Sequence, residues 1–223
     1  MNNNVLAFAS DEYDKKIRQT LPFYEEFYNQ ITGLIKTVYD KPVSWLDIGC
    51  GTGKMGQAAL ESGITLSRGV FCDISQEMLD IAKGRFVGTE FEFHISDARK
   101  MSYKEQFDVV TAVQVLHYLH EDDRKTAMER CYDALKENGS FISFENISPF
   151  SEIGRNVYLD KWKRYQEANG KSPEESSRHI ARYGKDYFPI NIEEHLKLMR
   201  SCGFRAVEVL WFSNMQAGFW GMK

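Results

Sequence analysis

Short apolar runs alternate with amphipathic segments along most of this chain. Short segments rich in apolar residues predict strands at 43–48, 66–72, 91–95, 107–113 and 140–145. Between them, apolar residues recur at a spacing of three and four, which predicts helices at 54–60, 75–83 and 122–135. Strands that alternate with helices in this way indicate an α/β domain built on a mostly parallel sheet.

The two ends of the chain depart from this alternation. Residues 5–39 predict two helical segments, and Pro22 fits the first turn of the second one. Residues 193–202 predict a last helix ended by Gly203, and residues 204–222 predict a hairpin that turns at Ser213-Asn214. The preceding residues 150–190 are polar and rich in aromatic side chains, and we expect a helical insertion there.

The first predicted strand leads into a loop with glycine at every second position. Asp47 ends the strand, and Gly49, Gly51 and Gly53 follow it. Glycine allows positive φ and lets the backbone approach a ligand closely. In an open α/β sheet, ligands bind at the carboxyl ends of the strands. The loop is therefore the predicted ligand site.

The identity of the ligand follows partly from the residues around these glycines. A P-loop is excluded, because Ile48 and Met55 occupy the positions of its first glycine and its hydroxyl residue. Residues 51–56 satisfy the dinucleotide pattern G-x-G-x-x-G, with Asp73 at a suitable distance for a ribose contact. Asp47, however, would repel a pyrophosphate and suits a ligand with an ammonium group, such as S-adenosylmethionine (SAM). On these residues alone, a nicotinamide-dependent oxidoreductase stays an alternative.

Five motifs in order resemble those of the class I SAM-dependent methyltransferases, and they are Leu46–Gly53, Cys72–Ser75, Ser96–Ala98, Phe107–Val110 and Leu135–Ser140. The resemblance implies a Rossmann-like fold with a seven-stranded, mostly parallel sheet, a C-terminal antiparallel hairpin and helices on both faces. It further implies one domain over 1–223, with an N-terminal helical cap at 1–40 and the 150–190 insertion near the acceptor site. The implied activity is transfer of a methyl group from SAM. A non-catalytic SAM-binding subunit is a further alternative.

The resemblance also implies which residues bind the cofactor. Arg18 and Tyr24 would meet the methionine carboxylate, Asp73 the ribose hydroxyls, and Asp97 with the Ala98 N–H the adenine. The complete implied set is Arg18, Tyr24, Asp47, Gly49, Cys50, Gly51, Asp73, Ile74, Asp97, Ala98 and Val113.

The acceptor is expected between the loop after the fourth strand and the 150–190 insertion. His117 is the one imidazole suited to act as a general base there, and its alternative role is that of a buried histidine behind the site. Aromatic side chains with polar tips would form the walls of the acceptor pocket, namely Tyr158, Trp162, Tyr183 and Tyr187.

A looser similarity extends over nearly the whole chain to one branch, the carboxy-SAM synthases of tRNA wobble-uridine modification. It is carried by Ala168-Asn169-Gly170, Glu194-His195 and Trp211-Phe212. The arginine that reads the extra carboxylate of the cofactor in that branch falls opposite Ile180 here, and the glycine loop differs as well. We therefore expect plain SAM as the methyl donor, with carboxy-SAM synthesis as the alternative.

Composition and net charge limit the classes of molecule that the protein is expected to bind. Hydrophobic residues make up 43% and charged residues 27%, as in an ordinary globular protein, and no apolar run approaches the ~20 residues of a membrane helix. A net charge of −4 argues against nucleic acid and favours a small-molecule acceptor. The four cysteines lack metal-binding spacing and are expected to be reduced and buried. We expect a cytoplasmic monomer or homodimer that binds no metal.

Overall fold

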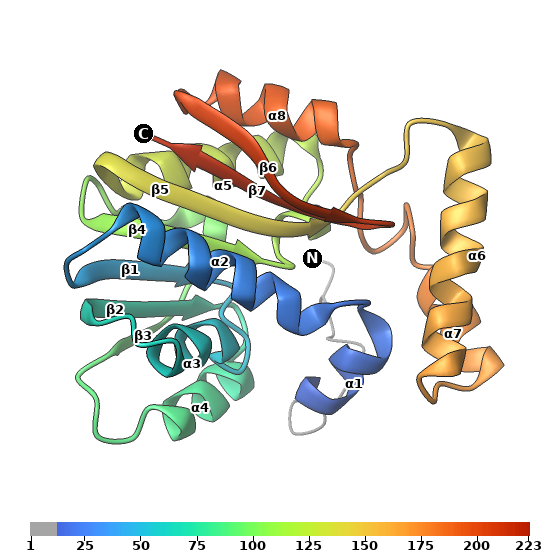
Figure 1. The fold of residues 1–223 in the computed structure, drawn as a ribbon, viewed down its shortest axis with the longest axis horizontal. Coiled ribbons are helices and arrows are strands. Elements are labelled where there is room, and N and C mark those ends of the chain that lie inside the picture. Colours follow the sequence, from blue (N-terminus) through green and yellow to red (C-terminus); the bar gives the residue numbers. More distant parts are fainter. Residues whose placement is uncertain (1–12) are drawn as a thin grey trace.

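A computed structural model describes residues 13–223 of the chain, and the part of the first predicted helix before Tyr13 lies outside them. Seven strands form one sheet in the order β3-β2-β1-β4-β5-β7-β6 (Figure 1). The strands are β1 Val43–Ile48, β2 Leu66–Asp73, β3 Glu92–Ile95, β4 Phe107–Val113, β5 Leu135–Asn146, β6 Ala206–Ser213 and β7 Gln216–Met222. The helices are α1 Tyr13–Thr20, α2 Tyr24–Val38, α3 Lys54–Glu61, α4 Gln76–Arg85, α5 Glu121–Ala134, α6 Glu152–Ala168, α7 Pro173–Ile180 and α8 Ile192–Ser201.

The topology confirms the predicted fold class. Strands β1 to β5 pair in parallel, whereas β7 runs antiparallel between β5 and β6. The order of the strands reverses at β1, where β2 lies on one side and β4 on the other. This reversal is a topological switch point, and the crevice outside the carboxyl ends of β1 and β4 is where such sheets bind ligands.

Alternation of side chains along the central strands gives the sheet two apolar faces. On the first, Trp45, Val109 and Phe144 pack against α2 and α3. On the second, Val110 and Phe141 pack against α5 and α8. We call them the α2 face and the α8 face. Both are needed, because a parallel sheet is stable only when helices cover each side.

One predicted boundary is wrong. Asn138-Gly139 was expected to form the turn before the fifth strand, but both residues lie inside β5, which begins at Leu135. Asn138 has φ 63°, so the strand is locally distorted there. Its N–H and the Gly139 C=O bond the last residue, Lys223, which extends the pairing with the C-terminal hairpin beyond the expected strand.

The 150–190 insertion forms α6 and α7, which stand beside one end of the sheet together with α1 (Figure 1). Trp162 Nε1 on α6 donates to the Thr20 C=O at the end of α1, at 2.6 Å. Tyr165 Oη donates to the Arg18 C=O at 3.1 Å. The N-terminal segment and the insertion are therefore joined, although they lie far apart in the sequence.

Three features expected from composition can be compared with the structure of residues 13–223. All four cysteines are free and buried, as expected. Within residues 13–223 no helix has the length and apolar character needed to cross a membrane. The same residues contain no group of three His, Cys, Asp or Glu side chains that could hold a metal ion.

Candidate functional site

The loop between β1 and α3 takes its shape from glycines with positive φ. Gly49 has φ 60°, and a Cβ there would lie 2.5 Å from a methyl group of Val115, so no other residue fits. Gly51 has φ 54°, but a Cβ there would meet nothing within 4 Å. Packing therefore explains Gly49. Gly51 instead borders open space, as expected for a position that a ligand approaches.

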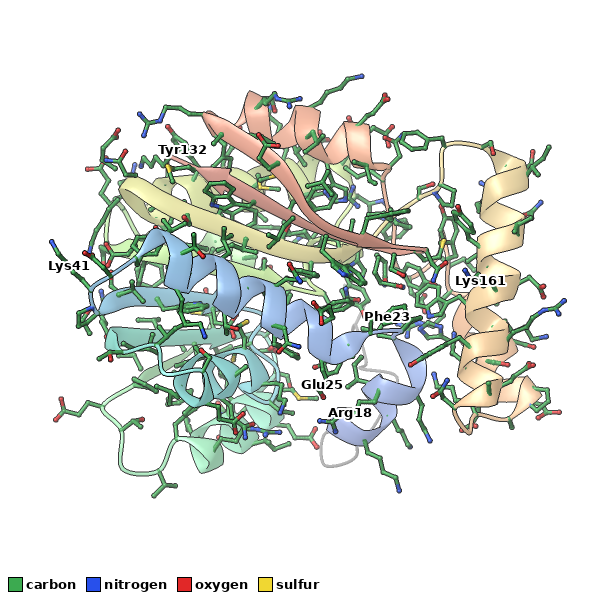
Figure 2. The ribbon with its side chains drawn as sticks, in the orientation of Figure 1. Arg18, Phe23, Glu25, Lys41, Tyr132 and Lys161 are labelled. Carbon is green, nitrogen blue, oxygen red and sulfur yellow. The ribbon has the colours of Figure 1, made fainter. Side chains whose placement is uncertain are left out.

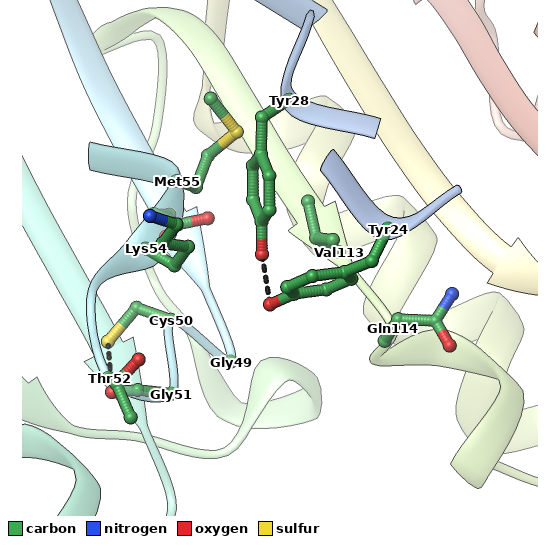
Figure 3. A pocket seen from close by; sticks show the side chains of 11 residues that line it. Tyr24, Tyr28, Gly49, Cys50, Gly51, Thr52, Lys54, Met55, Val113 and Gln114 are labelled. Carbon is green, nitrogen blue, oxygen red and sulfur yellow. Dashed lines mark hydrogen bonds between the residues drawn. The ribbon is translucent and has the colours of Figure 1, made fainter. Parts of the chain in front are cut away.

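A small pocket, partly open to solvent, lies over this loop. Figure 3 shows the hydroxyl groups of Tyr24 and Tyr28 pointing toward one another over the loop. The lining residues are Tyr24, Tyr28, Asp47, Gly49, Cys50, Gly51, Thr52, Lys54, Met55, Val113 and Gln114.

Asp47 is the acidic residue in the lining of the pocket. Its side chain is buried, and Oδ1 accepts a hydrogen bond of 2.7 Å from Thr111 Oγ1 on β4. Oδ2 has no partner among the described residues. Burial, with a smaller contribution from nearby Asp73, raises the pKa of Asp47 to about 7. A buried carboxylate oxygen without a donor is costly, and a ligand that carries an ammonium group would satisfy it.

The tyrosine pair closes the opposite wall of the pocket. Tyr24 and Tyr28 lie one turn apart on α2, and Tyr28 Oη donates to Tyr24 Oη. Burial raises the pKa of Tyr24 to about 12, so its hydroxyl stays protonated at neutral pH. The pair therefore offers neutral hydrogen-bonding groups and apolar rings, which exclude water from the space opposite Asp47.

Asp73 lies next to the loop at the end of β2. Gly51 N donates to its Oδ2 and Ser75 N to its Oδ1, both at 2.9 Å. Burial raises the pKa of this carboxyl, and the N–H donors partly oppose the effect. Each carboxylate oxygen keeps a second acceptor site, so Asp73 holds the glycine loop and can still accept ribose hydroxyls. Ile74 beside it is 61% exposed and offers an apolar surface.

Asp97 follows β3 at the same edge of the sheet. Its carboxylate forms a salt bridge with the Arg99 guanidinium and accepts the Arg99 N–H at 2.9 Å. The Arg99 bonds hold the pKa of Asp97 below its usual range. Ala98 is buried at the start of a short 3₁₀ helix. These two residues therefore lie at the expected edge but outside the lining of the pocket, and Asp97 already has a cationic partner.

Arg18 is placed differently from Tyr24. Its Nε donates to Glu25 Oε1 at 2.6 Å across the turn between α1 and α2, and its side chain is 52% exposed. Figure 2 shows Arg18 and Glu25 below this turn, close to Phe23. Arg18 does not line the pocket, whereas Tyr24, Asp47, Gly49, Cys50, Gly51 and Val113 do.

His117 lies in a second short 3₁₀ helix, η3 (Leu116–Tyr118), and it is fully buried. Its Nδ1 is 2.7 Å from Glu145 Oε2, and its Nε2 is 3.1 Å from Asn146 Nδ2. Both ring nitrogens therefore have protein partners, and the side chain is not part of the pocket lining. This geometry matches the alternative role, a buried histidine behind the site.

The four aromatic residues expected around the acceptor also lie outside the pocket lining. Trp162 and Tyr187 are buried, and both belong to the apolar cluster of the α2 face. Tyr158 and Tyr183 are partly buried against that cluster, and Tyr183 Oη donates to Ser148 Oγ at 2.8 Å. Tyr158 and Trp162 belong to α6, and Tyr183 and Tyr187 follow α7.

Sequence reasoning missed five residues that line the pocket, namely Tyr28, Thr52, Lys54, Met55 and Gln114. Tyr28 had a usable signal, because it lies four residues after Tyr24 and so shares its helix face. Gln114 directly follows a central strand at the ligand-binding edge. Its φ of 59° turns the chain out of β4.

Comparisons with known proteins agree with this geometry. The sequence of residues 46–139 matches the family described as methyltransferase domain. Carboxy-S-adenosyl-L-methionine synthases from Helicobacter hepaticus and Methylococcus capsulatus are each 24% identical, covering 92% and 90% of this chain and 88% and 86% of the relatives. A solved SAM-dependent methyltransferase from Thermotoga maritima superposes with a TM-score of 0.60 at 19% identity, covering 96% of this chain and 95% of its own.

Proposed function

We propose, from the premise that this chain is a class I SAM-dependent methyltransferase, that it methylates a small-molecule acceptor. Its cofactor is SAM, whose sulfonium supplies an activated methyl group when it is bound. The observation that carries the proposal is the unpartnered Oδ2 of Asp47, buried in a pocket with neutral tyrosines opposite. A nicotinamide dinucleotide offers no ammonium group for that oxygen.

The residues of the chain have separate tasks in this proposal. Asp47 binds the ammonium group, and Gly51 leaves room for the methionine chain. Asp73 fixes the loop through Gly51 N and accepts the ribose hydroxyls. Tyr24 and Tyr28 exclude water. Alignment and desolvation of two reactants can lower a barrier by roughly 7–11 kcal/mol, so a dedicated base is not required.

A small acceptor is supported by the net charge of the chain, which is −4. A nucleic acid would need a basic surface, because most of its affinity comes from phosphate contacts.

Calorimetry and product analysis test this proposal. We expect SAM and S-adenosylhomocysteine (SAH) to bind with affinities at least tenfold higher than that of NADH. Incubation with SAM and a fractionated metabolite extract should release SAH together with a product heavier by one methyl group. Tighter binding of NADH than of SAM would refute the methyltransferase proposal. SAM binding without turnover on any fraction would favour the non-catalytic subunit.

A second candidate function is synthesis of carboxy-SAM, because curated relatives with that name match about 90% of the chain. Against it, Ile180 at the end of α7 packs on the apolar cluster of the α2 face, where that branch has an arginine. Arg182 lies nearby with Nε bonded to Asp186 Oδ2 at 2.8 Å. Mass spectrometry of the ligand released from purified protein separates the two: SAM supports methyl transfer, and a species heavier by a carboxylate supports the second candidate.

A further inference from the structure

The lining of the cofactor pocket contains one acidic and one basic side chain, Asp47 and Lys54. Lys54 is the first residue of α3 and directly follows Gly53, the last glycine of the loop. Figure 3 shows its side chain beside Met55, on the wall across from Tyr24. Lys54 therefore brings a cationic group to the wall of the pocket that the glycine loop and α3 form.

The ammonium group of Lys54 has no partner within residues 13–223, neither a hydrogen-bond acceptor nor a carboxylate within 4 Å. Other helical lysines do have one: Lys83, Lys125 and Lys163 each form a salt bridge with a carboxylate on the same helix. The Lys54 side chain is nevertheless only partly exposed. Its three N–H donors are therefore available to a ligand in the pocket.

The start of α3 adds to the positive charge at this wall. Gly53 provides no side-chain cap, and the first turn of α3 contains no acidic residue. The first N–H groups of a helix lack partners within the helix, and the helix dipole favours an anion there. A second observation independently indicates a ligand at this place, because the buried Asp47 Oδ2 in the same pocket has no partner among the described residues. The pocket thus has an acidic and a basic side.

The other candidate cations lie outside the lining. Arg18, the expected partner of the methionine carboxylate, is bonded to Glu25 in an exposed turn. Arg85 donates to the Gln57 side chain at 2.6 Å on the outside of α3 and α4. Within residues 13–223, Lys54 is therefore the one basic side chain that lines the pocket.

The charges of the pocket match the amino-acid end of SAM, which carries an ammonium group and a carboxylate on the same carbon. If Asp47 binds the ammonium group, the carboxylate enters the pocket with it. A carboxylate that leaves water without a charged or hydrogen-bonding partner is strongly unfavourable. Tyr24 can offer only a neutral hydroxyl, because its pKa is raised to about 12. A lysine offers a charge-assisted hydrogen bond, which is about twice as strong.

We infer that Lys54 binds the α-carboxylate of the cofactor, so that Asp47 and Lys54 together hold the two charges of its amino-acid end. Lys54 takes the place that the sequence had suggested for Arg18. The inference rests on the proposed function through its cofactor alone, since SAM and carboxy-SAM share this amino-acid end. It makes the pair a specificity device that selects against adenosine thioethers without an α-amino acid group.

Three ligands that differ by one charged group test this inference by titration calorimetry of the full-length protein. They are SAH, its analogue without the carboxylate, 5′-S-(3-aminopropyl)-5′-thioadenosine, and its analogue without the ammonium group, 5′-S-(3-carboxypropyl)-5′-thioadenosine. We expect wild type to bind the analogue without the carboxylate about ten- to thirtyfold more weakly than SAH, the lower part of the range for a charge-assisted hydrogen bond.

Substitution of Lys54 should remove this preference selectively. In Lys54→Met, the ratio of the two dissociation constants should fall about fivefold or more, while the penalty for losing the ammonium group stays within about twofold of wild type. Asp47→Asn should show the reverse pattern. Lys54→Arg keeps the charge and should keep most of the preference for the carboxylate. Lys125→Gln removes an exposed lysine on α5 paired with Glu129 and should keep the wild-type ratios.

The outcomes separate this inference from the proposed function. Thermal unfolding verifies that each variant is folded, and Lys54→Gln is the second variant if Lys54→Met does not fold. Failure of wild type to bind SAH would refute the proposed cofactor, and the inference with it. If wild type binds SAH, the role of Lys54 alone is overturned by equal wild-type affinities for SAH and the analogue without the carboxylate, by an unchanged ratio in the folded Lys54 variant, or by equal weakening of all three ligands. Loss of the ratio in Arg18→Gln, with the Lys54 variants unchanged, would assign the carboxylate to Arg18 instead.

Discussion

Asp47→Asn is expected to weaken SAM binding and, at the same time, to stabilise the free protein. Burial raises the pKa of Asp47 to about 7, with a further contribution from Asp73 and opposition from the Thr111 hydrogen bond. Ionised Asp47 is therefore unfavourable in the free protein, yet it is the form that binds an ammonium group. Stability and cofactor binding place opposite demands on this one side chain.

The effect on stability can be worked out from the direction of the shift. The folded-state pKa lies above the reference value of 3.8, so the native protein keeps a proton that the unfolded chain releases. Each pH unit in which the two states differ by one proton changes the unfolding free energy by about 1.4 kcal/mol. The stability of wild type therefore falls through this group as pH rises from about 4 to about 7.

Asparagine removes this pH dependence but leaves one amide N–H without a partner, which costs about 1–3 kcal/mol. We expect a net gain of about 1–3 kcal/mol at pH 7.5, or roughly 2–12 °C in Tm, measured by calorimetric unfolding of the free protein. The gain should shrink or vanish at pH 5, where wild-type Asp47 is already protonated.

SAM affinity should change in the opposite sense. For wild type, titration calorimetry should show tighter binding as pH rises from 5.5 to 7.5, because Asp47 ionises over about this range. Asp47→Asn should show a flat profile and a Kd about 12- to 140-fold higher at pH 7.5, equivalent to a charge-assisted hydrogen bond of about 1.5–3 kcal/mol. Asp80→Asn alters an exposed carboxylate on α4 paired with Lys83 and should behave as wild type. A pH-independent wild-type affinity, or unchanged binding by Asp47→Asn, would refute the reasoning.

Three further substitutions test other parts of the structure. Gly51→Val should raise the Kd for SAM at least tenfold in calorimetry, because the valine side chain would enter open pocket space. The positive φ at this position should also cost about 1–2 kcal/mol of stability. Unchanged SAM binding would contradict this expectation. Trp162→Phe leaves the Thr20 C=O without its donor and should lower Tm by about 2–8 °C. An unaltered Tm would contradict this expectation. His117→Ala removes the ring partner of buried Glu145 and should destabilise the fold by about 3–5 kcal/mol in denaturant unfolding; a loss of turnover at wild-type stability would restore His117 as a candidate base.

The sequence alone determined the architecture and the location of the cofactor loop. Both depend on local information: apolar runs bounded by turns define strands, and Asp47 with its alternating glycines defines a strand end that a ligand can approach. The C-terminal hairpin could also be predicted from the sequence, because its two strands are adjacent in the chain. The start of β5 was misjudged, because Asn138-Gly139 normally favours a turn. Its pairing with Lys223 could not be seen locally. The start of the second helix was also misjudged, since α2 begins at Tyr24, two residues after Pro22.

Tertiary structure decided which side chains line the site. The sequence showed that His117 follows a central strand, but burial of its ring depends on Glu145 and Asn146, which lie 28 and 29 residues away. Likewise, Trp162 reaches the Thr20 C=O across 142 residues, which turns an expected acceptor contact into a brace between α1 and α6. Periodicity reports which face of an element is apolar, not which distant segment covers it. The unpartnered oxygen of Asp47 is visible only once every neighbour is in place, because a missing hydrogen bond is a property of the whole packed surrounding.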